Sequence, residues 1–253
     1  EFGIGHERAL CGVYDLGGGT VDYHFGIFTG GEPPYRYESR QNGGNPRLGC
    51  ENILEALAYE VFSLVKEKLR ENKIPYEFPG QYPDRLEDIR YTSHSHSARF
   101  NTLGMLNALR QLWTRDFQTE DAAPDRLCYF QIYTETKEAL FLEIEAAPAK
   151  KDKEFQAEWK KESENTVKIL LDPDFLKNFF REKLATTVWE FLDMQRKARA
   201  GAEGDLPLVI FLAGNGSQAP MVTELFQEYL PRFQMENCQL YPPLGTREAA
   251  EQG

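Results

Sequence analysis

The first forty-six residues alternate in a way that is typical of β-strands joined by turns. An apolar run at 9–15 ends in an acid and a glycine cluster, and aromatic and β-branched residues fill 21–29 before two further glycines. A third stretch, 35–41, starts with alternating aromatic and polar residues and continues until the sequence N-G-G-N-P at 42–46 interrupts it. Because such runs, bounded by glycine and asparagine, favour strands, we predict three antiparallel strands here.

Helical spacing of apolar residues marks four later segments. The clearest lies at 51–69, where apolar residues recur every three or four positions, and 100–113 repeats the spacing. A third helix is expected to run through residue 192, with Asp172 as its N-cap and Pro173 at its first position. A fourth opens with another proline and covers 220–229. Proline is well tolerated at a first helical position, so the starts of the last two helices are well defined.

The remaining segments are assigned from their composition. Residues 127–134 and 138–144 are rich in Tyr, Phe and Ile and predict a β-hairpin. Residues 206–213 are the most apolar stretch, which is expected of a strand covered on both faces. The charge run at 150–164 is interpreted as a solvated helix or loop without special chemistry.

The order of these elements is strand-strand-strand-helix, then an inserted region, then helix-strand-helix. This alternation predicts an α/β protein. We expect residues 1–72 and 171–253 to form one lobe and residues 73–170 to form an inserted α+β subdomain.

Charge and cysteine content narrow the classes of function. The chain has 29 Lys and Arg against 40 Asp and Glu, a net charge of −11, so it would repel nucleic-acid phosphates and anionic lipid. No apolar run approaches the roughly 20 residues that a membrane helix needs. The four cysteines are far apart without a C-x-x-C pair, which favours reduced thiols in a cytoplasmic protein. We therefore expect neither nucleic acid nor a membrane as partner.

The strongest local signal is the octapeptide D-L-G-G-G-T-V-D at 15–22, between two predicted strands. Three consecutive glycines remove every Cβ from the turn, so the backbone can approach a bulky anion and direct successive N–H groups at its oxygens. Thr20 adds a hydroxyl donor, while Asp15 and Asp22 can hold water around a divalent metal or orient a water for attack. The motif predicts metal-nucleotide chemistry, with a purely structural glycine-rich turn as the alternative.

A second glycine turn, A-G-N-G-S at 213–217, follows the buried strand. Ligands of open α/β sheets bind beyond the carboxyl ends of the strands, and small residues there let a base or ribose lie against the backbone. Glycine turns after buried strands are common, so this motif alone is weak evidence for a ligand site. Together with the first motif it is much stronger evidence.

These motifs resemble those of the actin-like ATPase superfamily. Residues 15–22 resemble its second phosphate-binding motif, closest to the DnaK-type (70-kilodalton heat-shock) chaperones, and 212–220 are similar to its adenosine motif. Residues 48–52 (L-G-C-E-N) resemble the family's L-G-G-x-D/E segment, and 248–250 resemble its closing helix. The resemblance implies a ribonuclease-H-like lobe that binds ATP or ADP with Mg²⁺ against a first lobe, which this chain lacks. It also implies a protein client or co-chaperone as a further partner.

The family's residue roles can be carried over by motif position. Asp15 becomes the catalytic carboxylate, which positions metal-bound or attacking water. The glycines and Thr20 of the first motif would donate to the terminal phosphates, 49–51 would face the ribose and phosphates, and the last motif would face the adenosine. The nucleotide-binding residues implied in this way are Gly17, Gly18, Gly19, Thr20, Asp22, Gly49, Glu51, Gly214, Asn215 and Gly216.

Three functions stay open on the sequence. The first is the lobe of an ATPase whose hydrolysis drives a domain motion. The second is a binding or regulatory module without turnover, favoured by Cys50 in place of a glycine, Gln218 in place of an arginine that stacks on adenine, and Arg247 in place of an acid. The third is a metabolite kinase of the same superfamily, in which a substrate hydroxyl attacks. The chain reads as part of a longer protein, and we expect it to bind nucleotide weakly by itself.

Overall fold

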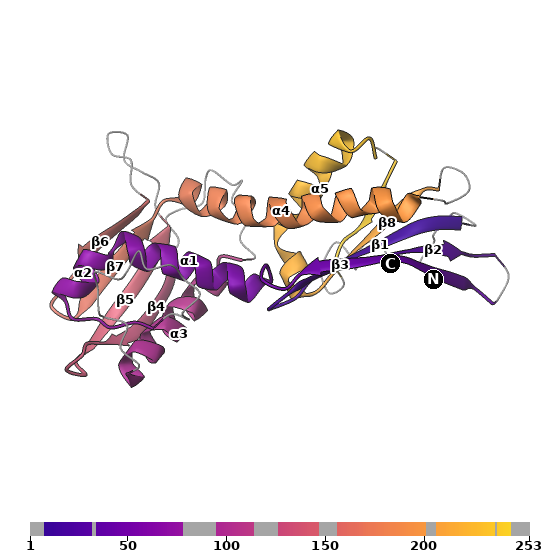
Figure 1. The fold of residues 1–253 in the computed structure, drawn as a ribbon. Coiled ribbons are helices and arrows are strands. Elements are labelled where there is room, and N and C mark those ends of the chain that lie inside the picture. Colours follow the sequence, from indigo (N-terminus) through magenta and orange to yellow (C-terminus); the bar gives the residue numbers. More distant parts are fainter. Residues whose placement is uncertain are drawn as a thin grey trace. The chain divides into compact units, whose positions relative to one another are not determined.

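The chain forms two compact units, each built from a sheet and helices (Figure 1). The computed structural model describes residues 8–31, 34–77, 95–113, 126–146, 156–200, 206–235 and 237–243. Unit 1 consists of Glu1–Ile53 and Phe180–Gly253, and unit 2 of Leu54–Phe179. The mixture of strands and helices confirms the predicted α/β class. The lobe boundaries expected at 72/73 and 170/171 stay a prediction.

Unit 1 contains a mixed five-stranded sheet in the order β3-β2-β1-β8-β9. The strands β1 and β2 pair antiparallel, as do β2 and β3, whereas β8 runs parallel to both β1 and β9. The three N-terminal strands therefore form a meander, and the crossover to β8 brings a distant segment beside β1. The strands are β1 (Arg8–Leu16), β2 (Val21–Thr29), β3 (Arg36–Asn45), β8 (Leu208–Ala213) and β9 (Gln239–Tyr241).

The helices α4 (Pro173–Arg199) and α5 (Pro220–Arg232) lie against this sheet (Figure 1). Aromatic side chains form the core between them and one face of the sheet. Phe191 of α4 is fully buried. Its ring centroid lies 5.7 Å from those of Tyr14 and Tyr23, 4.6 Å from that of Phe25 and 5.6 Å from that of Phe226. Burial of large aromatic side chains contributes much of the free energy of folding, so this cluster fixes α4 on the sheet.

Two tyrosine hydroxyls also connect the sheet to α4. The Tyr14 hydroxyl lies 2.6 Å from Thr187 Oγ1, and the Tyr23 hydroxyl donates to the carbonyl of Thr187 at 2.9 Å. Burial raises the pKa of both phenols well above the ordinary value, and the charge of Glu190 adds to the shift. Both hydroxyls therefore ionise only at a pH above that at which an exposed tyrosine does.

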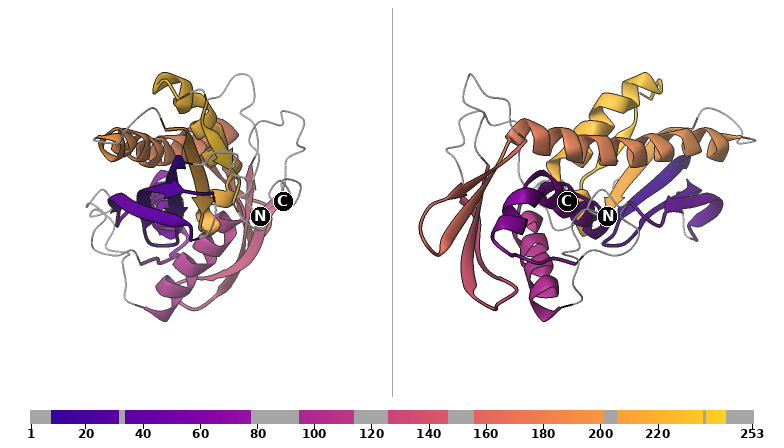
Figure 2. Two further views of the ribbon diagram at one scale, coloured as in Figure 1. Left: turned by 90° about the vertical axis from the view of Figure 1, so that its right-hand side faces the viewer. Right: turned by 60° about the vertical axis from the view of Figure 1, so that its left-hand side comes forward.

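Unit 2 contains a four-stranded mixed sheet in the order β4-β5-β7-β6. Apolar side chains alternate along β5 and β7, so that Leu142 and Ile144 are buried together with Val167 and Ile169. The helices α1 and α3 lie on the same side of this sheet (Figure 2). Besides the first residues of α4, the elements that lie in or enter this unit are α1 (Cys50–Leu64), α2 (Lys66–Glu71), α3 (His96–Arg110), β4 (Arg126–Tyr133), β5 (Ala139–Ala146), β6 (Ala157–Lys161) and β7 (Thr166–Leu171).

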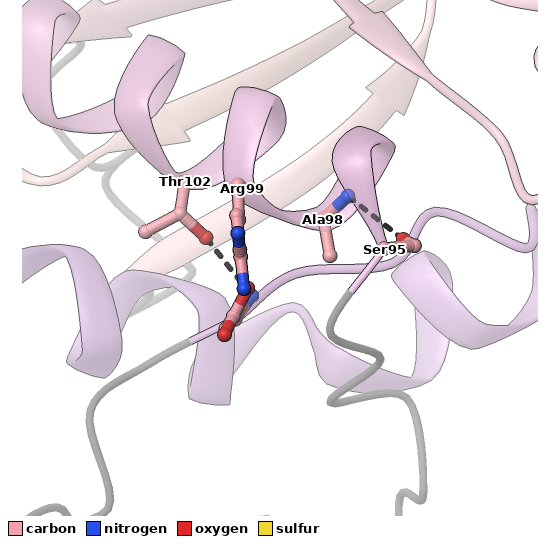
Figure 3. Close-up of polar contacts among 5 residues, drawn as sticks. Ser95, Ala98, Arg99 and Thr102 are labelled. Atoms are coloured by element: carbon pink, nitrogen blue, oxygen red, sulfur yellow. Dashed lines mark hydrogen bonds and ion pairs between the residues drawn. The ribbon is translucent and has the colours of Figure 1, made fainter.

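The N-terminus of α3 is capped and tied to the chain segment that precedes it (Figure 3). The side chain of Ser95 accepts a hydrogen bond from the amide of Ala98 at 3.1 Å, which satisfies one of the helix's free N–H groups. Thr102 Oγ1 accepts from the amide of Glu77 at 3.0 Å, and Arg99 Nε lies 2.8 Å from Glu77 Oε2. These contacts explain why α3 begins at His96, ahead of the predicted start at residue 100.

The structure corrects the predicted helix at 51–69, which is two helices. Val65 leaves the helical conformation, with φ −107° and ψ 13°, so α1 ends at Leu64 and α2 begins at Lys66. A β-branched residue loses side-chain freedom in a helix, which makes Val65 a weak point. Apolar spacing continues through the break and therefore could not reveal it.

Three strand predictions also need correction. β3 continues to Asn45 because Gly43 and Gly44 pair with β2, although glycines usually interrupt strands. The charge run at 150–164, interpreted as helix or loop, contains β6. β6 is an edge strand, and charged side chains are common at sheet edges because they discourage pairing with other chains. β7 and the three-residue β9 carried no predicted assignment.

Two observations bear on the expected absence of a membrane helix and on the expected reduced state of the cysteines. Within the described ranges, no helix has both the length and the apolar character that crossing a bilayer requires. Cys11, Cys50 and Cys238 form no disulfide. The cytoplasmic location stays a prediction.

The aromatic core of unit 1 predicts the effect of removing its central ring. Phe191→Ala should lower the free energy of unfolding by about 3–5 kcal/mol, because it leaves a cavity among four rings. Trp189→Ala, on the same helix but with a side chain 53% exposed, serves as the control and should cost much less. Urea unfolding followed by circular dichroism measures both changes. Equal losses for the two variants would contradict this account of the core.

Candidate functional site

The two glycine motifs come together at one end of the unit 1 sheet. β1 and β8 are parallel neighbours, and their register places Asp15 beside Ala213. On the other side of β1, Asp15 is paired with Asp22 of β2. The turns that follow β1 and β8 therefore leave the sheet at the same edge, which is where ligands of open α/β sheets bind.

The second turn packs directly on the end of β1. Gly214 has φ +78°, and a Cβ there would lie 2.4 Å from Asp15 Oδ1 and from the Leu16 carbonyl oxygen. A Cβ at Gly216 would lie 2.5 Å from Leu16 Cγ. Since a side chain fits at neither position, both glycines are needed for this close approach. Asn215 stands between them with an exposed side chain.

The first turn is held by the N-terminus of α1. The amide of Cys50 donates to the Gly17 carbonyl at 2.9 Å, and the amide of Glu51 donates to the Gly18 carbonyl at 2.8 Å. The side-chain amide of Asn52 donates to the Gly19 carbonyl at 2.6 Å. We call these three hydrogen bonds the α1 latch. The first N–H groups of a helix lack acceptors within the helix. The latch therefore supplies acceptors to the donors of α1 and donors to the carbonyls of the turn.

The latch determines which way the amides of the turn point. In a trans peptide the C=O and N–H groups point in opposite directions. Since the carbonyls of Gly17, Gly18 and Gly19 point towards α1, the amides of Gly18, Gly19 and Thr20 point away from it. These three amides donate to no acceptor among the described residues, whereas the Gly17 amide donates to the Thr20 carbonyl at 2.9 Å. Three successive amides on one side of a turn form a cradle for an anion.

Gly49 allows α1 to approach the turn. A Cβ at this position would lie 2.3 Å from the carbonyl carbon of Gly19 and 2.4 Å from both the Gly18 oxygen and the Thr20 nitrogen. These are backbone atoms, which cannot move aside as the end of a side chain can. Gly49 is therefore a structural requirement of the latch. The side chain of Glu51 also borders the turn, since a Cβ at Gly18 would lie 3.5 Å from its Cγ.

Two carboxylates stand beside the turn on the exposed face of the sheet. Asp15 and Asp22 are exposed and paired in register on adjacent strands. Their outer neighbours in the same row are Ala213 on β8 and Gly44 on β3, so little side-chain bulk flanks them. Thr20 Oγ1 donates to Asp22 Oδ2 at 2.8 Å, which aligns the Thr20 hydroxyl with Asp22. The pair offers several acceptors to water or to a hydrated cation.

The described residues contain no group of three or more His, Cys, Asp or Glu side chains placed to hold a metal ion. Asp15 and Asp22 are only two ligands. A divalent metal at this edge would therefore need water and a bound anion to complete its coordination, because Mg²⁺ prefers six oxygen ligands.

Every residue predicted for the site lies in unit 1 at this edge, and the structure adds two that had no predicted role. Asn52 belongs to the third sequence motif, but its bond to the Gly19 carbonyl joins residues 33 positions apart. Gly44 has φ +157°, and a Cβ there would lie 2.4 Å from the Val21 carbonyl oxygen and 3.1 Å from Asp22 Oδ1. Arg247, which replaces an acid of the family, and 248–250, which resemble its closing helix, lie outside the described ranges.

Comparison with known proteins does not assign the chain to a family: no family model matches the sequence, and no curated protein matches it significantly. The function has to be inferred from the residues and geometry of this site.

The α1 latch predicts different results for alanine at two glycines. Gly49→Ala should lower the free energy of unfolding by about 1–3 kcal/mol, because the new Cβ overlaps backbone atoms of the turn. Gly19→Ala is the matched control, since a Cβ at Gly19 meets no atom within 4 Å. It should leave stability within about 1 kcal/mol of the unmodified chain. Thermal or urea unfolding measures both, and a Gly49→Ala variant as stable as Gly19→Ala would refute the close approach of α1.

Proposed function

We propose that this chain is an ATP-binding lobe of a DnaK-type or other actin-like ATPase, which in the intact protein hydrolyses ATP to drive a domain motion. The observation that carries the proposal is the α1 latch, because it leaves the amides of Gly18, Gly19 and Thr20 together on the side away from α1. A phosphate group is the anion whose oxygens match several amides of a glycine turn.

The strand order supports a ribonuclease-H-like fold for unit 1. An antiparallel β1-β2-β3 meander followed by a parallel β8 beside β1, in the order β3-β2-β1-β8-β9, is the arrangement expected of such a lobe. The resemblance of 15–22, 48–52 and 212–220 to the actin-like motifs agrees with it. In the structure these three segments meet at one edge, which chance matches would have no reason to do.

In the proposed complex, backbone amides of the chain bind the phosphates and its carboxylates bind water. The amides of Gly18, Gly19 and Thr20 donate to the terminal phosphates, with Gly17 shaping the turn. When bound, Mg²⁺ neutralises part of the phosphate charge and supplies ordered water. Asp15 and Asp22 accept hydrogen bonds from water at this edge, and Asp22 also holds the Thr20 hydroxyl in place.

Asp15 is the proposed catalytic residue. Its carboxylate lies beside Gly214 and is exposed. An ionised carboxylate is an acceptor only, so it can orient a water molecule with a lone pair directed at a phosphorus atom. Asp22 stands in register beside it but is occupied by the Thr20 hydroxyl, which makes Asp15 the better candidate.

The adenosine is assigned to the second turn. Gly214, Asn215 and Gly216 offer a surface with little side-chain bulk, and Gly49 and Glu51 lie by the first turn, where the ribose and phosphates are expected. Gln218 is exposed and cannot replace the charge of a stacking arginine. Base selectivity is therefore expected to be low. The partners in this proposal are the first lobe and a protein client or co-chaperone.

The proposal is tested by Asp15→Asn in the full-length protein. An amide keeps the shape of the side chain but is a much weaker acceptor, so ATP turnover should fall by about 10²–10⁴. Nucleotide affinity should stay within about tenfold, which corresponds to about 1.4 kcal/mol. Phosphate-release kinetics and calorimetry with Mg-ATP measure the two quantities.

Asp174→Asn, the same chemical change in unit 2, is the control and should leave both quantities unchanged. Turnover that is unaffected by Asp15→Asn would remove Asp15 from the mechanism. A full-length protein that binds Mg-ATP without turnover would be a nucleotide-binding regulatory module, and one that binds no nucleotide would contradict the proposal altogether.

A further inference from the structure

Unit 1 contains a pocket of about 530 Å³ at the end of the sheet opposite the glycine turns. It lies at the first residues of β1 and β3 and the last residues of β2. The nine residues of β1 separate it from those turns by about 26 Å at the usual rise per residue. The pocket therefore takes no part in the proposed nucleotide site.

Three polar side chains form a row across these strands. Arg8 of β1 is paired in register with Thr29 of β2, and Thr29 is paired with Arg36 of β3. Directly paired residues on neighbouring strands share a face of the sheet, so both guanidiniums and the Thr29 hydroxyl belong to one face. Ile27 and Glu38 are paired with each other and form the next row on that face. All five residues line the pocket.

The three polar groups of the row have no acceptor or donor of their own. Among the described residues, the side chains of Arg8 and Arg36 form no ion pair or hydrogen bond, and neither does the Thr29 hydroxyl. Arg8 is half-buried. A guanidinium that has lost part of its hydration usually has an acceptor in the protein. An anion above the row would supply acceptors to all three groups.

The pocket is locally positive, although the chain carries a net charge of −11. Among the described residues that line it, Glu38 is the one carboxylate. Glu38 is already bound by Arg40, whose Nε and Nη2 lie 3.3 Å from its two oxygens. Glu38 therefore does not neutralise Arg8 and Arg36.

Protection of a sheet edge explains only one of the two arginines. β3 is an edge strand, and charged side chains such as Arg36 discourage pairing with other chains there. β1 lies inside the sheet between β2 and β8, so Arg8 protects no edge. Two like charges in one row also repel each other, and an anion between them would remove that repulsion.

The spacing of the row fits a single tetrahedral anion. Neighbouring strands are about 4.8 Å apart, so the Cα atoms of Arg8 and Arg36 are about 10 Å apart with Thr29 midway. Arginine side chains are long enough to meet above Thr29 from both sides. Guanidinium groups bind phosphate oxygens in pairs, and a phosphate monoester carries nearly two negative charges at neutral pH. Two guanidiniums match that charge, whereas one carboxylate would neutralise only half of theirs.

We propose that this pocket binds the phosphate monoester group of a small molecule. Arg8 and Arg36 hold the phosphate from two sides, and the Thr29 hydroxyl donates to it between them. The rest of the molecule lies over the second row, which Ile27 and Glu38 form. The site is independent of the nucleotide chemistry proposed for the other end of the sheet.

The test uses two probes that differ in charge. Phenyl phosphate is nearly a dianion at pH 7.5, whereas benzenesulfonate has the same ring and a tetrahedral head group with a single charge. NMR titration of the 253-residue chain should show saturable binding of phenyl phosphate, with the largest shifts at the amides of Arg8, Thr29 and Arg36. Benzenesulfonate should bind about tenfold more weakly, because it cannot neutralise both guanidiniums.

Substitutions identify the groups that bind the phosphate. Arg36→Gln should weaken binding of phenyl phosphate about tenfold. It should leave the unfolding midpoint unchanged, because this side chain has no partner among the described residues. Arg70→Gln is the matched control and should change neither quantity, since Arg70 is equally exposed and equally without a described side-chain partner but lies on α2 in unit 2. Glu38→Gln should strengthen binding about threefold by removing a negative charge from the pocket.

Several results would overturn the proposal. They are an absence of saturable phenyl phosphate binding, shifts confined to the amides of 18–20, and equal affinities for the two probes. Equal effects of Arg36→Gln and Arg70→Gln on affinity, or weaker binding in Glu38→Gln, would also contradict it. A lower unfolding midpoint in Arg36→Gln with affinity retained would show that Arg36 has a structural role instead.

Discussion

The hydrogen bonds between the start of α1 and the carbonyls of Gly17, Gly18 and Gly19 are the constraint on which the rest of the candidate site depends. A glycine turn can adopt many conformations, because glycine has more backbone freedom than any other residue. Ordering such a turn therefore costs more conformational entropy than ordering other turns. The latch fixes one of them. It uses the free donors of a helix N-terminus to hold the turn, and the amides of Gly18, Gly19 and Thr20 then donate to no described acceptor. Gly49 is the residue that permits this arrangement, because any side chain there would separate α1 from the turn.

Much of the site could be predicted from residue types, whereas its internal geometry could not. The D-x-G-G-G-T-x-D sequence between two strands indicates a turn that a bulky anion can approach, and the apolar run at 206–213 indicates a central strand ending in a second turn. Which amides are free, however, depends on bonds from Cys50, Glu51 and Asn52 to residues about 33 positions earlier. No local pattern contains that information. The division of α1 from α2 at Val65 and the strand β6 were missed for a related reason, since packing and sheet pairing decide them.

The aromatic core gives unit 1 a packed frame that supports the candidate site. Phe191 and Thr187 fix α4 to β1 and β2, so the last turns of α4 are placed by the same packing that supports Asp15 and the glycine turns. Sites built on packed strands and helices are positioned more accurately than sites on loops. At the carboxyl end of β1 and β8 the frame presents carboxylates and backbone amides.

We propose that the latch leaves the amides of Gly18, Gly19 and Thr20 available to phosphate. The most direct measurement is residue-resolved amide hydrogen exchange and chemical shift by NMR, in the full-length protein with and without Mg-ATP. The amides of Cys50 and Glu51 should be protected in both states. Those of Gly18, Gly19 and Thr20 should exchange freely in the absence of nucleotide and become protected and shifted when it binds. Unprotected Cys50 and Glu51 amides, or a saturated nucleotide complex in which the Gly18–Thr20 amides neither shift nor gain protection, would contradict it.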